Sequence, residues 1–460
     1  MLSLISYFLA MYDIIFKESD VKILYLTVQN QLKTLSVREY KTLRTLCRLS
    51  KNLFNEAMYS VRQYYFAEHK YLHYENNYHV CKESENYQAL GTEIAQQTLK
   101  VVDRCFKSFF ALISKAKSGS YRFNMINLPH YLKKDGWFTL IIPRINIKDG
   151  YFTLPMSRDF KKEHGELRFN IPPNIADKEI QQVRIYPRDN ARFFEIEYIY
   201  EQPEQKADVD ADKFLGVDLG LDNLATCVTS EGASFIVDGK QIKSYNRLYN
   251  KESARLQSIK DKQKIKGFTE RQYLNLRKRN ARIKHAMSVA ARRIIAYCIN
   301  HRIGNIVVGY NPDWKREINI GSVNTQNFVQ IPHGQLREKL AYLCELYGIN
   351  YVEQEESYTS KSSFFDDDDL PTYNADNPQK YKFSGIRITR GQYRTSTGYI
   401  FNADVNGALN ILRKSKLVNL RVLQDRGCVN QPRRIRVFWS GSMRVQTSGR
   451  VPNFTESPCL

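Results

Sequence analysis

Three carboxylates stand at the ends of segments that the sequence predicts to be core elements. Asp218 lies in the segment GVDLG, at the end of an apolar strand and before a glycine-bounded turn. Glu356 ends a second predicted strand, and Asp404 lies at the start of a predicted helix in FNADVNGALNILRK. Three carboxylates at one edge of a sheet would repel each other, and Mg²⁺, with Mn²⁺ as an alternative, would relieve that repulsion through oxygen ligands. The pattern therefore predicts a two-metal site that hydrolyses phosphodiester bonds.

Each carboxylate also has a simpler interpretation when it is taken alone. Turn amides could satisfy Asp218, Glu356 could be a solvated edge residue, and Asp404 could complement a helix dipole. Glu353 and Glu355 are less favoured alternatives to Glu356, and Glu355 and Glu356 should not both face the metals because successive strand residues alternate sides. The order Asp, Glu, Asp favours a nuclease over a strand-joining transposase, whose usual order is Asp, Asp, Glu.

The positive charge of the chain is concentrated in two stretches. The 460 residues include 69 Lys and Arg against 48 Asp and Glu, which gives a net charge of +21. Residues 240–302 hold 18 basic and 3 acidic residues, and residues 412–450 hold 10 and 1. Residues 353–376, by contrast, hold 8 acidic residues and 1 basic residue. A basic chain with one acidic island indicates a polyanion held near a divalent-metal site.

The hydrophobic pattern changes along the chain. Residues 21–35 have the pattern of a strand, and Ser36 with Glu39 forms a capping box that opens a long helical region. From about 120 to 203 the period is two, which predicts short strands. Residues 201–212 are polar and are expected to form a linker.

A third region begins at Lys213 and contains buried strands, a long basic helical stretch and a last helix near Asp404. Within it, residues 366–400 are expected to be irregular, and the tail from about 415 shows little periodicity. The eight cysteines form no CxxC pair, so neither a zinc knuckle nor a secretory disulfide framework is expected. No apolar run approaches the ~18 residues that a membrane span needs.

At these residues the chain resembles the TnpB family, the transposon-encoded RNA-guided DNA endonucleases related to type V CRISPR effectors and to Fanzor proteins. The matching segments, in order, are GVDLGLDNLAT, NIVVGYN, NTQNFVQIP, EESYTSK and NADVNGALNILRK. The resemblance covers about residues 21–414 and implies a multidomain protein of α+β and α/β class: a β-barrel (wedge) domain with an inserted helical recognition domain, followed by an RNase H-like RuvC nuclease domain. The implied boundaries are an N-terminal extension (1–20), the wedge domain (21–36 and 119–205), the recognition domain (37–118), the RuvC domain (213–414, with basic helices at 241–302 and an insert at 357–402) and a basic tail (415–460).

Two departures from the family pattern concern the site. In most of the family the central glutamate follows the strand that here reads IVVG, and that position is Gly309. We assign its role to Glu356, before the YTS motif, because Fanzor proteins and some TnpB relatives have a similarly relocated glutamate. The family's four-cysteine zinc knuckle is also missing, since SKSSFFDDDD and ITRGQYRTSTGY contain no cysteine. No zinc is expected, and the insert must be held by aromatic packing or be mobile.

The resemblance also implies the partners. These are a noncoding guide RNA, double-stranded DNA and a displaced single strand, bound by a monomer without a membrane. The location is the cytoplasm, on the nucleoid, of a prokaryote, or the nucleus for a eukaryotic or viral protein. The residues expected to contact phosphates are Arg277, Lys278, Arg279, Arg282 and Lys284 in the basic helices, and Lys361 near the site. Because Gly309 replaces the usual glutamate, a nuclease-dead RNA-guided DNA-binding repressor is the second hypothesis.

Overall fold

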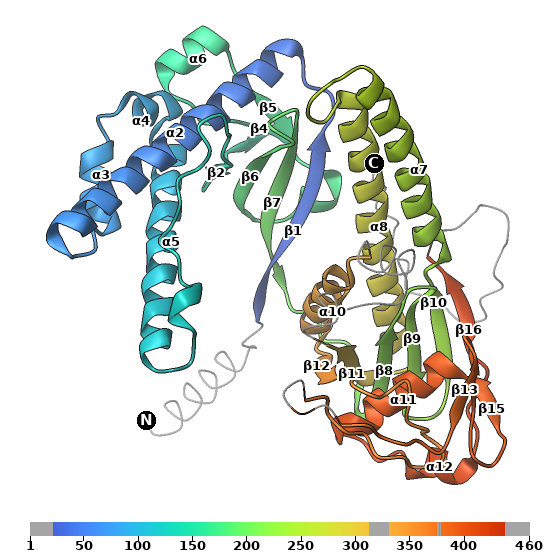
Figure 1. Cartoon of the computed structure of the whole chain (residues 1–460). Coiled ribbons are helices and arrows are strands. Elements are labelled where there is room, and N and C mark those ends of the chain that lie inside the picture. The colour runs from blue at the N-terminus through green and yellow to red at the C-terminus, as the bar shows by residue number, and fades with distance from the viewer. Residues whose placement is uncertain (1–21, 312–330, 375–376, 378, 438–460) are drawn as a thin grey trace, which may run out of the picture. The chain divides into compact units, whose positions relative to one another are not determined.

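The computed structural model describes residues 22–311, 331–374, 377 and 379–437, and the chain divides into two compact units, Met1–Pro203 and Glu204–Leu460 (Figure 1). The expected N-terminal extension, most of the NTQNFVQIP motif and the end of the basic tail lie outside the described residues. No helix in the described ranges is long and apolar enough to cross a membrane.

The first unit contains an antiparallel sheet that is interrupted in sequence by helices. Its strands, in sheet order, are β1 (Ile23–Leu32), β7 (Phe193–Pro203), β6 (Ile180–Arg188) and β2 (Leu140–Ile142). Since β1 pairs with β7 over its full length, the chain leaves the sheet after β1 and returns to it more than a hundred residues later. A separate sheet comprises β3 (Ile147–Lys148), β4 (Tyr151–Thr153) and β5 (Arg168–Asn170). Closure into a barrel stays a prediction, because the described pairings form two sheets.

The helices of the first unit lie between β1 and β2 in the chain. They are α2 (Val37–Glu68), α3 (Tyr74–Cys81), α4 (Glu85–Leu90) and α5 (Thr92–Lys117), with the short α6 (Arg158–His164) further on. The predicted capping box is present: the Ser36 hydroxyl accepts from the Glu39 amide, and the Glu39 carboxylate accepts from the Ser36 amide. Leu43 and Leu46 are fully buried in the apolar core that α2 shares with α5.

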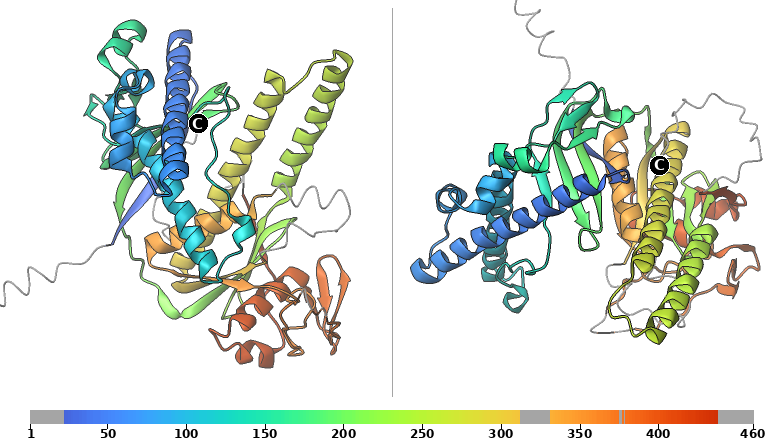
Figure 2. Two further views of the ribbon diagram at one scale, coloured as in Figure 1. Left: turned by 60° about the vertical axis from the view of Figure 1, so that its left-hand side comes forward. Right: turned by 90° about the horizontal axis from the view of Figure 1, so that it is seen from above.

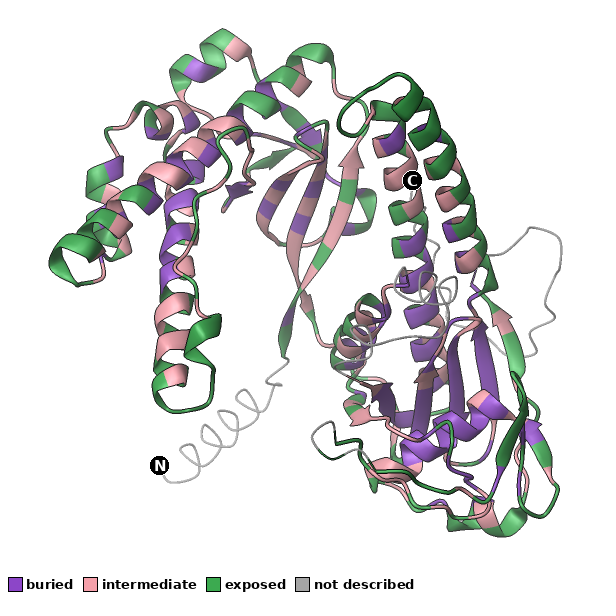
Figure 3. Ribbon diagram, viewed as in Figure 1, coloured by how far each residue is buried: buried purple, intermediate pink, exposed green. Residues whose placement is uncertain are grey.

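The second unit is built on a six-stranded sheet. In sheet order its strands are β12 (Asn350–Glu355), β11 (Ile303–Tyr310), β8 (Asp210–Leu219), β9 (Asn223–Thr229), β10 (Ser234–Asp238) and β16 (Arg433–Arg436). The first three strands in the chain, β8 to β10, form an antiparallel meander, and β11 and β12 then add parallel to β8. This is the mixed sheet of the expected RNase H-like domain, and Figure 3 shows its central strands buried.

Helices flank this sheet. They are α7 (Lys240–Lys262), α8 (Glu270–Asn300), α10 (His333–Tyr347) and α11 (Ala403–Ser415). The first two form the basic stretch, and they run side by side as a helical hairpin in both views of Figure 2. The buried side chains of α11 include Val405, Leu409 and Leu412, which pack on β8 and its neighbours.

Three parts of the second unit differ from the sequence expectation. Residues 366–400, expected to be irregular, contain a small sheet of β13 (Ile386–Thr389), β14 (Gln392–Arg394) and β15 (Ile400–Asn402). The tail contains α12 (Arg421–Arg426) and the strand β16, which pairs parallel to β10. The linker is shorter than predicted, because β7 extends to Pro203 and β8 begins at Asp210. The strands that the prediction missed, β13 to β16, are short and mostly exposed, so they lack the apolar alternation on which a strand prediction relies.

Candidate active site

Asp218 is held where a central strand meets a helix. It is the penultimate residue of β8, and α11 crosses this strand at close range. Two glycines make that approach possible: a Cβ added at Gly216 would lie 2.6 Å from the carbonyl oxygen of Ala408, and one added at Gly407 would lie 2.7 Å from Asp218 Oδ2. The Asp218 carboxylate therefore fills the space that a larger residue at position 407 would need.

Asp404 comes to the same place from the first turn of α11. The side chain of Asn402 caps this helix, accepting hydrogen bonds from the amides of Asp404 and Val405 at 3.0 and 3.1 Å. Asp404 Oδ2 accepts a 2.6 Å hydrogen bond from Asn223 Nδ2, and Oδ1 pairs with Arg387 at 3.1 Å. Arg387 belongs to β13 in the insert, so this arginine ties the insert to the proposed site.

Glu356 follows β12 and reaches across to the end of β11. A Cβ added at Gly309 would collide with Glu356 Oε2 and would lie 2.6 Å from Ile411 Cδ1. The Glu356 carboxyl group thus occupies the space beside the backbone position where most of the family has its glutamate. Position 309 must remain glycine for Glu356 to stay there.

The surroundings of Asp218 and Glu356 disfavour the charged form of both carboxyl groups. Burial raises the pKa of Asp218 well above its usual value, and the charges of Glu356 and Asp404 raise it further. Burial, followed by the charge of Glu355, raises the pKa of Glu356 to about 7. Neither carboxylate makes a hydrogen bond or an ion pair within the described part of the chain. Buried carboxylates without partners are costly unless a proton or a cation neutralises them.

Glu355 and Glu353 have protein partners instead. Burial raises the pKa of Glu355, but hydrogen bonds from Lys414 Nζ at 2.5 Å and the Ser357 amide at 2.6 Å outweigh it and leave the pKa lowered. Glu353 pairs with Arg337 at 2.9 Å. Of the three neighbouring glutamates, only Glu356 acts electrostatically on Asp218, as the alternation of strand side chains suggests.

The donor set suits a hard divalent cation, which prefers carboxylate oxygens. As the side chains stand, however, the described residues contain no group of three or more His, Cys, Asp or Glu side chains arranged to hold a metal ion. One reason is that Arg387 already neutralises Asp404. Asp218, Glu356 and Asp404 could therefore hold metal ions only after their side chains adjust.

Comparison with known proteins finds relatives along most of the chain. Residues 197–315 match the family model OrfB_IS605, described as a probable transposase, and residues 333–411 match the TNB domain of Cas12f1-like proteins. The TnpB-like protein ORF457 of Acidianus two-tailed virus is 26% identical over 415 residues, covering 82% of this chain and 83% of the viral protein. The chain is thus similar to TnpB-like proteins.

The fold of this TnpB-like chain also has a counterpart among solved structures. A cryo-EM structure of a Cas12f1–sgRNA–target DNA complex matches it with a TM-score of 0.54 and 13% sequence identity, covering 82% of this chain and 83% of the other. The likeness supports the mixed α and β architecture described above.

The basic residues predicted to contact nucleic acid lie in two environments. On α8, Lys278, Arg282 and Lys284 are exposed, and Arg277 and Arg279 are half-buried. Arg279 donates to Asn246 on α7 at 2.8 Å and so helps to join the two helices. Burial lowers the pKa of Arg279. Lys361 is exposed, in the insert.

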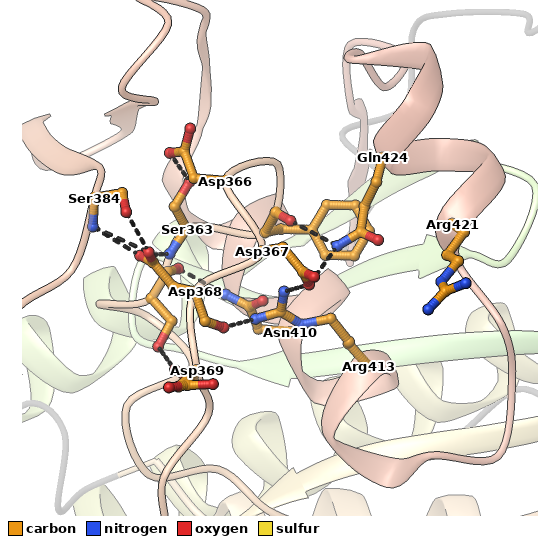
Figure 4. Close-up of polar contacts among 12 residues, drawn as sticks. Ser363, Asp366, Asp367, Asp368, Asp369, Ser384, Asn410, Arg413, Arg421 and Gln424 are labelled. Atoms are coloured by element: carbon orange, nitrogen blue, oxygen red, sulfur yellow. Dashed lines mark hydrogen bonds and ion pairs between the residues drawn. The ribbon is translucent and has the colours of Figure 1, made fainter.

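Hydrogen bonds to aspartates brace the insert (Figure 4). Asp366 accepts from the Ser363 hydroxyl and from the amide and hydroxyl of Ser396. Asp368 accepts from the Ser363 amide at 2.8 Å and from the Ser384 hydroxyl at 2.6 Å. These bonds join the start of the insert to its later turns. The sequence analysis missed them because serine and aspartate partners that lie far apart in the chain have no spacing rule.

Aromatic side chains also pack together to hold the insert, as predicted. Phe364 and Tyr393 are fully buried, and Phe365 contacts Phe401 and Tyr399 at ring distances of 5.0 and 5.4 Å. Asp367 adds a link to the helices, since it accepts from Arg413 at 2.6 Å and from Gln424 at 2.9 Å (Figure 4).

Proposed function

We propose that this protein is an RNA-guided, Mg²⁺-dependent DNA endonuclease, with Mn²⁺ as an alternative ion. Its guide is a noncoding RNA from the transposon end, and it acts as a monomer on double-stranded DNA with a displaced single strand. One observation carries the proposal: the carboxylates of Asp218, at the end of the central strand β8, and Glu356, after the edge strand β12, lie without partners among the described residues, with Asp404 beside Asp218. The similarity of the chain to TnpB-like proteins supports the assignment.

The chain's own residues have distinct tasks in this proposal. Asp218, Glu356 and Asp404 hold the metal ions, which when bound activate a water and stabilise the leaving oxygen. Arg387 must leave Asp404 to free that carboxylate, and a DNA phosphate is a suitable alternative partner for its guanidinium. The exposed cations Lys278, Arg282 and Lys284 on α8, together with Lys361 in the insert, contact phosphates of the guide–target duplex by charge rather than by sequence.

The test begins with the RNA that co-purifies with the full-length chain. Sequencing should identify a transposon-end RNA, and the complex should cleave DNA that matches its guide segment. Asp218→Ala and Asp404→Ala should abolish cleavage while leaving DNA binding nearly intact. Asp425→Ala is the matched control, because Asp425 is an exposed aspartate on α12. Full cutting by either site variant would contradict the assignment.

The relocated glutamate has its own control. Glu356→Gln should abolish cleavage, whereas Glu355→Gln should retain it, because Glu355 is paired with Lys414. The reverse result would assign the ligand to Glu355 instead.

A nuclease-dead DNA-binding repressor is the second candidate. The contact between Arg387 and Asp404 favours it, because this arginine neutralises one of the three proposed metal ligands. Guide-dependent binding without cleavage in Mg²⁺ or Mn²⁺, by the wild type and by Glu356→Gln alike, would support the repressor. Strand-joined products would instead support the transposase named in one matching family model.

The contribution of α8 can be measured separately. Replacing Lys278 or Arg282 by alanine should weaken binding to all DNA sequences similarly and reduce the slope of log affinity against log salt by about 1 each. A change in sequence preference would contradict phosphate contact.

A further inference from the structure

The first unit contains a cavity that the proposed nuclease site does not use. It has a volume of about 610 Å³ and lies among α2, α3, α4 and the segment around Tyr131. Figure 1 shows α3 and α4 beside α2. The lining residues that matter here are Lys51, Asn52, Glu56, Tyr59, Asn86 and Tyr131.

The floor of this cavity holds a donor and an acceptor without protein partners. Lys51 is 6% exposed as a residue and its ammonium group keeps contact with solvent; in the described ranges no hydrogen bond or ion pair reaches that group, although the charge of Asp135 acts on it. Glu56 Oε1 accepts from Asn86, but Oε2 is buried and unpaired among the described atoms. Buried polar groups are normally satisfied, so Glu56 Oε2 indicates a ligand with a polar edge, and the Lys51 donor lines the same cavity.

The neighbouring amides hold this floor in place. The Asn52 side-chain amide donates to Asn86 Oδ1 at 3.1 Å, and the Asn86 side-chain amide donates to Glu56. Asn55, also in the cavity wall, is used by the fold itself, since it exchanges hydrogen bonds of 2.8 and 3.0 Å with the backbone of Leu132. These hydrogen bonds fix the orientation of Glu56, whose Oε1 accepts a hydrogen bond while Oε2 has no partner among the described atoms.

The rim of the cavity is aromatic. Tyr59 is 58% exposed and Tyr131 is 42% exposed, so both rings are accessible to a ligand. The guanidinium of Arg62 lies 4.8 Å from the centre of the Tyr131 ring and restrains it. Exposed tyrosines next to a cation are typical stacking platforms for single-stranded nucleic acid.

The two halves of the cavity define the ligand chemistry. Its ligand must be planar to stack on a tyrosine, and its edge must offer both an acceptor to Lys51 and an N–H donor to Glu56. A phosphate does not fit, because Glu56 would repel it. We propose that this cavity binds one unpaired nucleobase of a bound strand, through the stacking rim and the Lys51–Glu56 floor. The inference rests on the proposed function, because it takes nucleic acid as the ligand.

Binding assays on single strands test this proposal. The full-length chain, freed of RNA at high salt, is titrated into fluorescent 12-nucleotide unstructured RNA and DNA strands of one sequence, and anisotropy is measured. Tyr59→Ala should weaken binding by about 5- to 150-fold, the range expected for loss of one stacked base. The matched control is Tyr121→Ala, which removes an exposed tyrosine that does not line the cavity. The strand type that loses more affinity identifies the source of the base.

Abasic strands separate a base contact from a phosphate contact. With abasic nucleotides throughout, Tyr59→Ala and Lys51→Met should bind as weakly as the wild type, because the group they recognise is gone. Lys51→Met should also leave the salt slope unchanged on normal strands. A slope reduced by about 1, with the effect persisting on abasic strands, would mean a phosphate contact and would overturn the proposal.

The remaining outcomes are also decisive. Equal losses from Tyr59→Ala and Tyr121→Ala would indicate a diffuse aromatic surface rather than a pocket. Unchanged binding of both strands by Tyr59→Ala would overturn the inference, because a misfolded variant would lose binding rather than keep it. Either result would leave the proposed function intact if the wild type binds its RNA and cleaves DNA. Failure of the wild type to bind any strand would instead contradict the proposed function itself.

Discussion

Two acidic groups in the second unit have opposite environments. The carboxylates of Asp218 and Glu356 have no hydrogen-bonding partner in the part of the chain that the structure describes, and burial raises the pKa of both. Asp366 and Asp368, about ten residues after Glu356, accept hydrogen bonds from three serines. Burial raises the pKa of Asp366, but the bonds from Ser363 and Ser396 outweigh it and leave the pKa lowered.

The difference shows that acidic composition alone does not identify a metal site. Residues 353–376 form one acidic island in the sequence, yet Asp366 and Asp368 act as acceptors that brace the fold. What distinguishes Asp218 is the lack of donors, which leaves a buried charge to be neutralised from outside. The number of donors around each carboxylate therefore separates a structural acid from a proposed metal ligand.

The largest expected effect comes from Asp218→Asn. Cleavage should fall below detection, because the amide removes a proposed metal ligand. The free energy of unfolding without metal should rise by about 0.5–2 kcal/mol, since a buried charge next to Glu356 and Asp404 is removed. Denaturant unfolding and a plasmid cleavage assay measure the two quantities. A loss of stability would show that Asp218 is a structural acid like Asp366.

Asp368→Ala should have the opposite effect on stability. It leaves the donors of Ser363 and Ser384 without an acceptor, so the free energy of unfolding should fall by about 1–3 kcal/mol. Asp425→Ala, on an exposed surface, should change it by less than about 0.5 kcal/mol. If Asp368→Ala behaves like this control, the bonds in Figure 4 do not hold the insert.

Mg²⁺ should stabilise the folded protein through the proposed metal ligands and not through the aspartates that brace the insert. At ten times its dissociation constant, an ion that binds only the folded state adds about 1.4 kcal/mol to the free energy of unfolding. The wild type and Asp368→Ala should show this gain, and Asp218→Asn should lose it. A zinc chelator should leave all three proteins unchanged. Stabilisation of Asp218→Asn by Mg²⁺ would place the ion elsewhere.

The smallest effect concerns pH. The pKa of Glu356 rises from 4.5 to about 7 on folding, so the folded state keeps a proton that the unfolded state has lost. Stability should therefore fall as pH rises from about 4.5 to 7, and Glu356→Gln should reduce that decline, to which the raised pKa of Asp218 also contributes. For Asp366, whose pKa is lowered from 3.8, stability should be lost as pH falls below about 4. Melting temperatures from pH 3 to 8, without divalent ions, measure both slopes.

The sequence predicted the elements that carry the proposed site but not the contacts that hold it. The Ser36 capping box, the strand with Asp218 and the helix at Asp404 follow local rules of spacing and capping, and the structure confirms these elements. The contact of Arg387 with Asp404 has no local signal, because it joins a short exposed strand to a helix. The strand β16 was missed for a similar reason, since RRIR resembles a solvated tail until β10 supplies its partner.

The separation of the site residues along the chain has a consequence for synthesis. Asp218 precedes Asp404 by 186 positions, so the helix that carries Asp404 is made long after the strand that carries Asp218. At about 5–20 residues per second, a ribosome needs roughly 10–40 s to cover that distance. During this interval the nascent chain carries its basic helices without a complete set of acids. The proposed metal site is therefore incomplete until the segment that forms α11 has been synthesised.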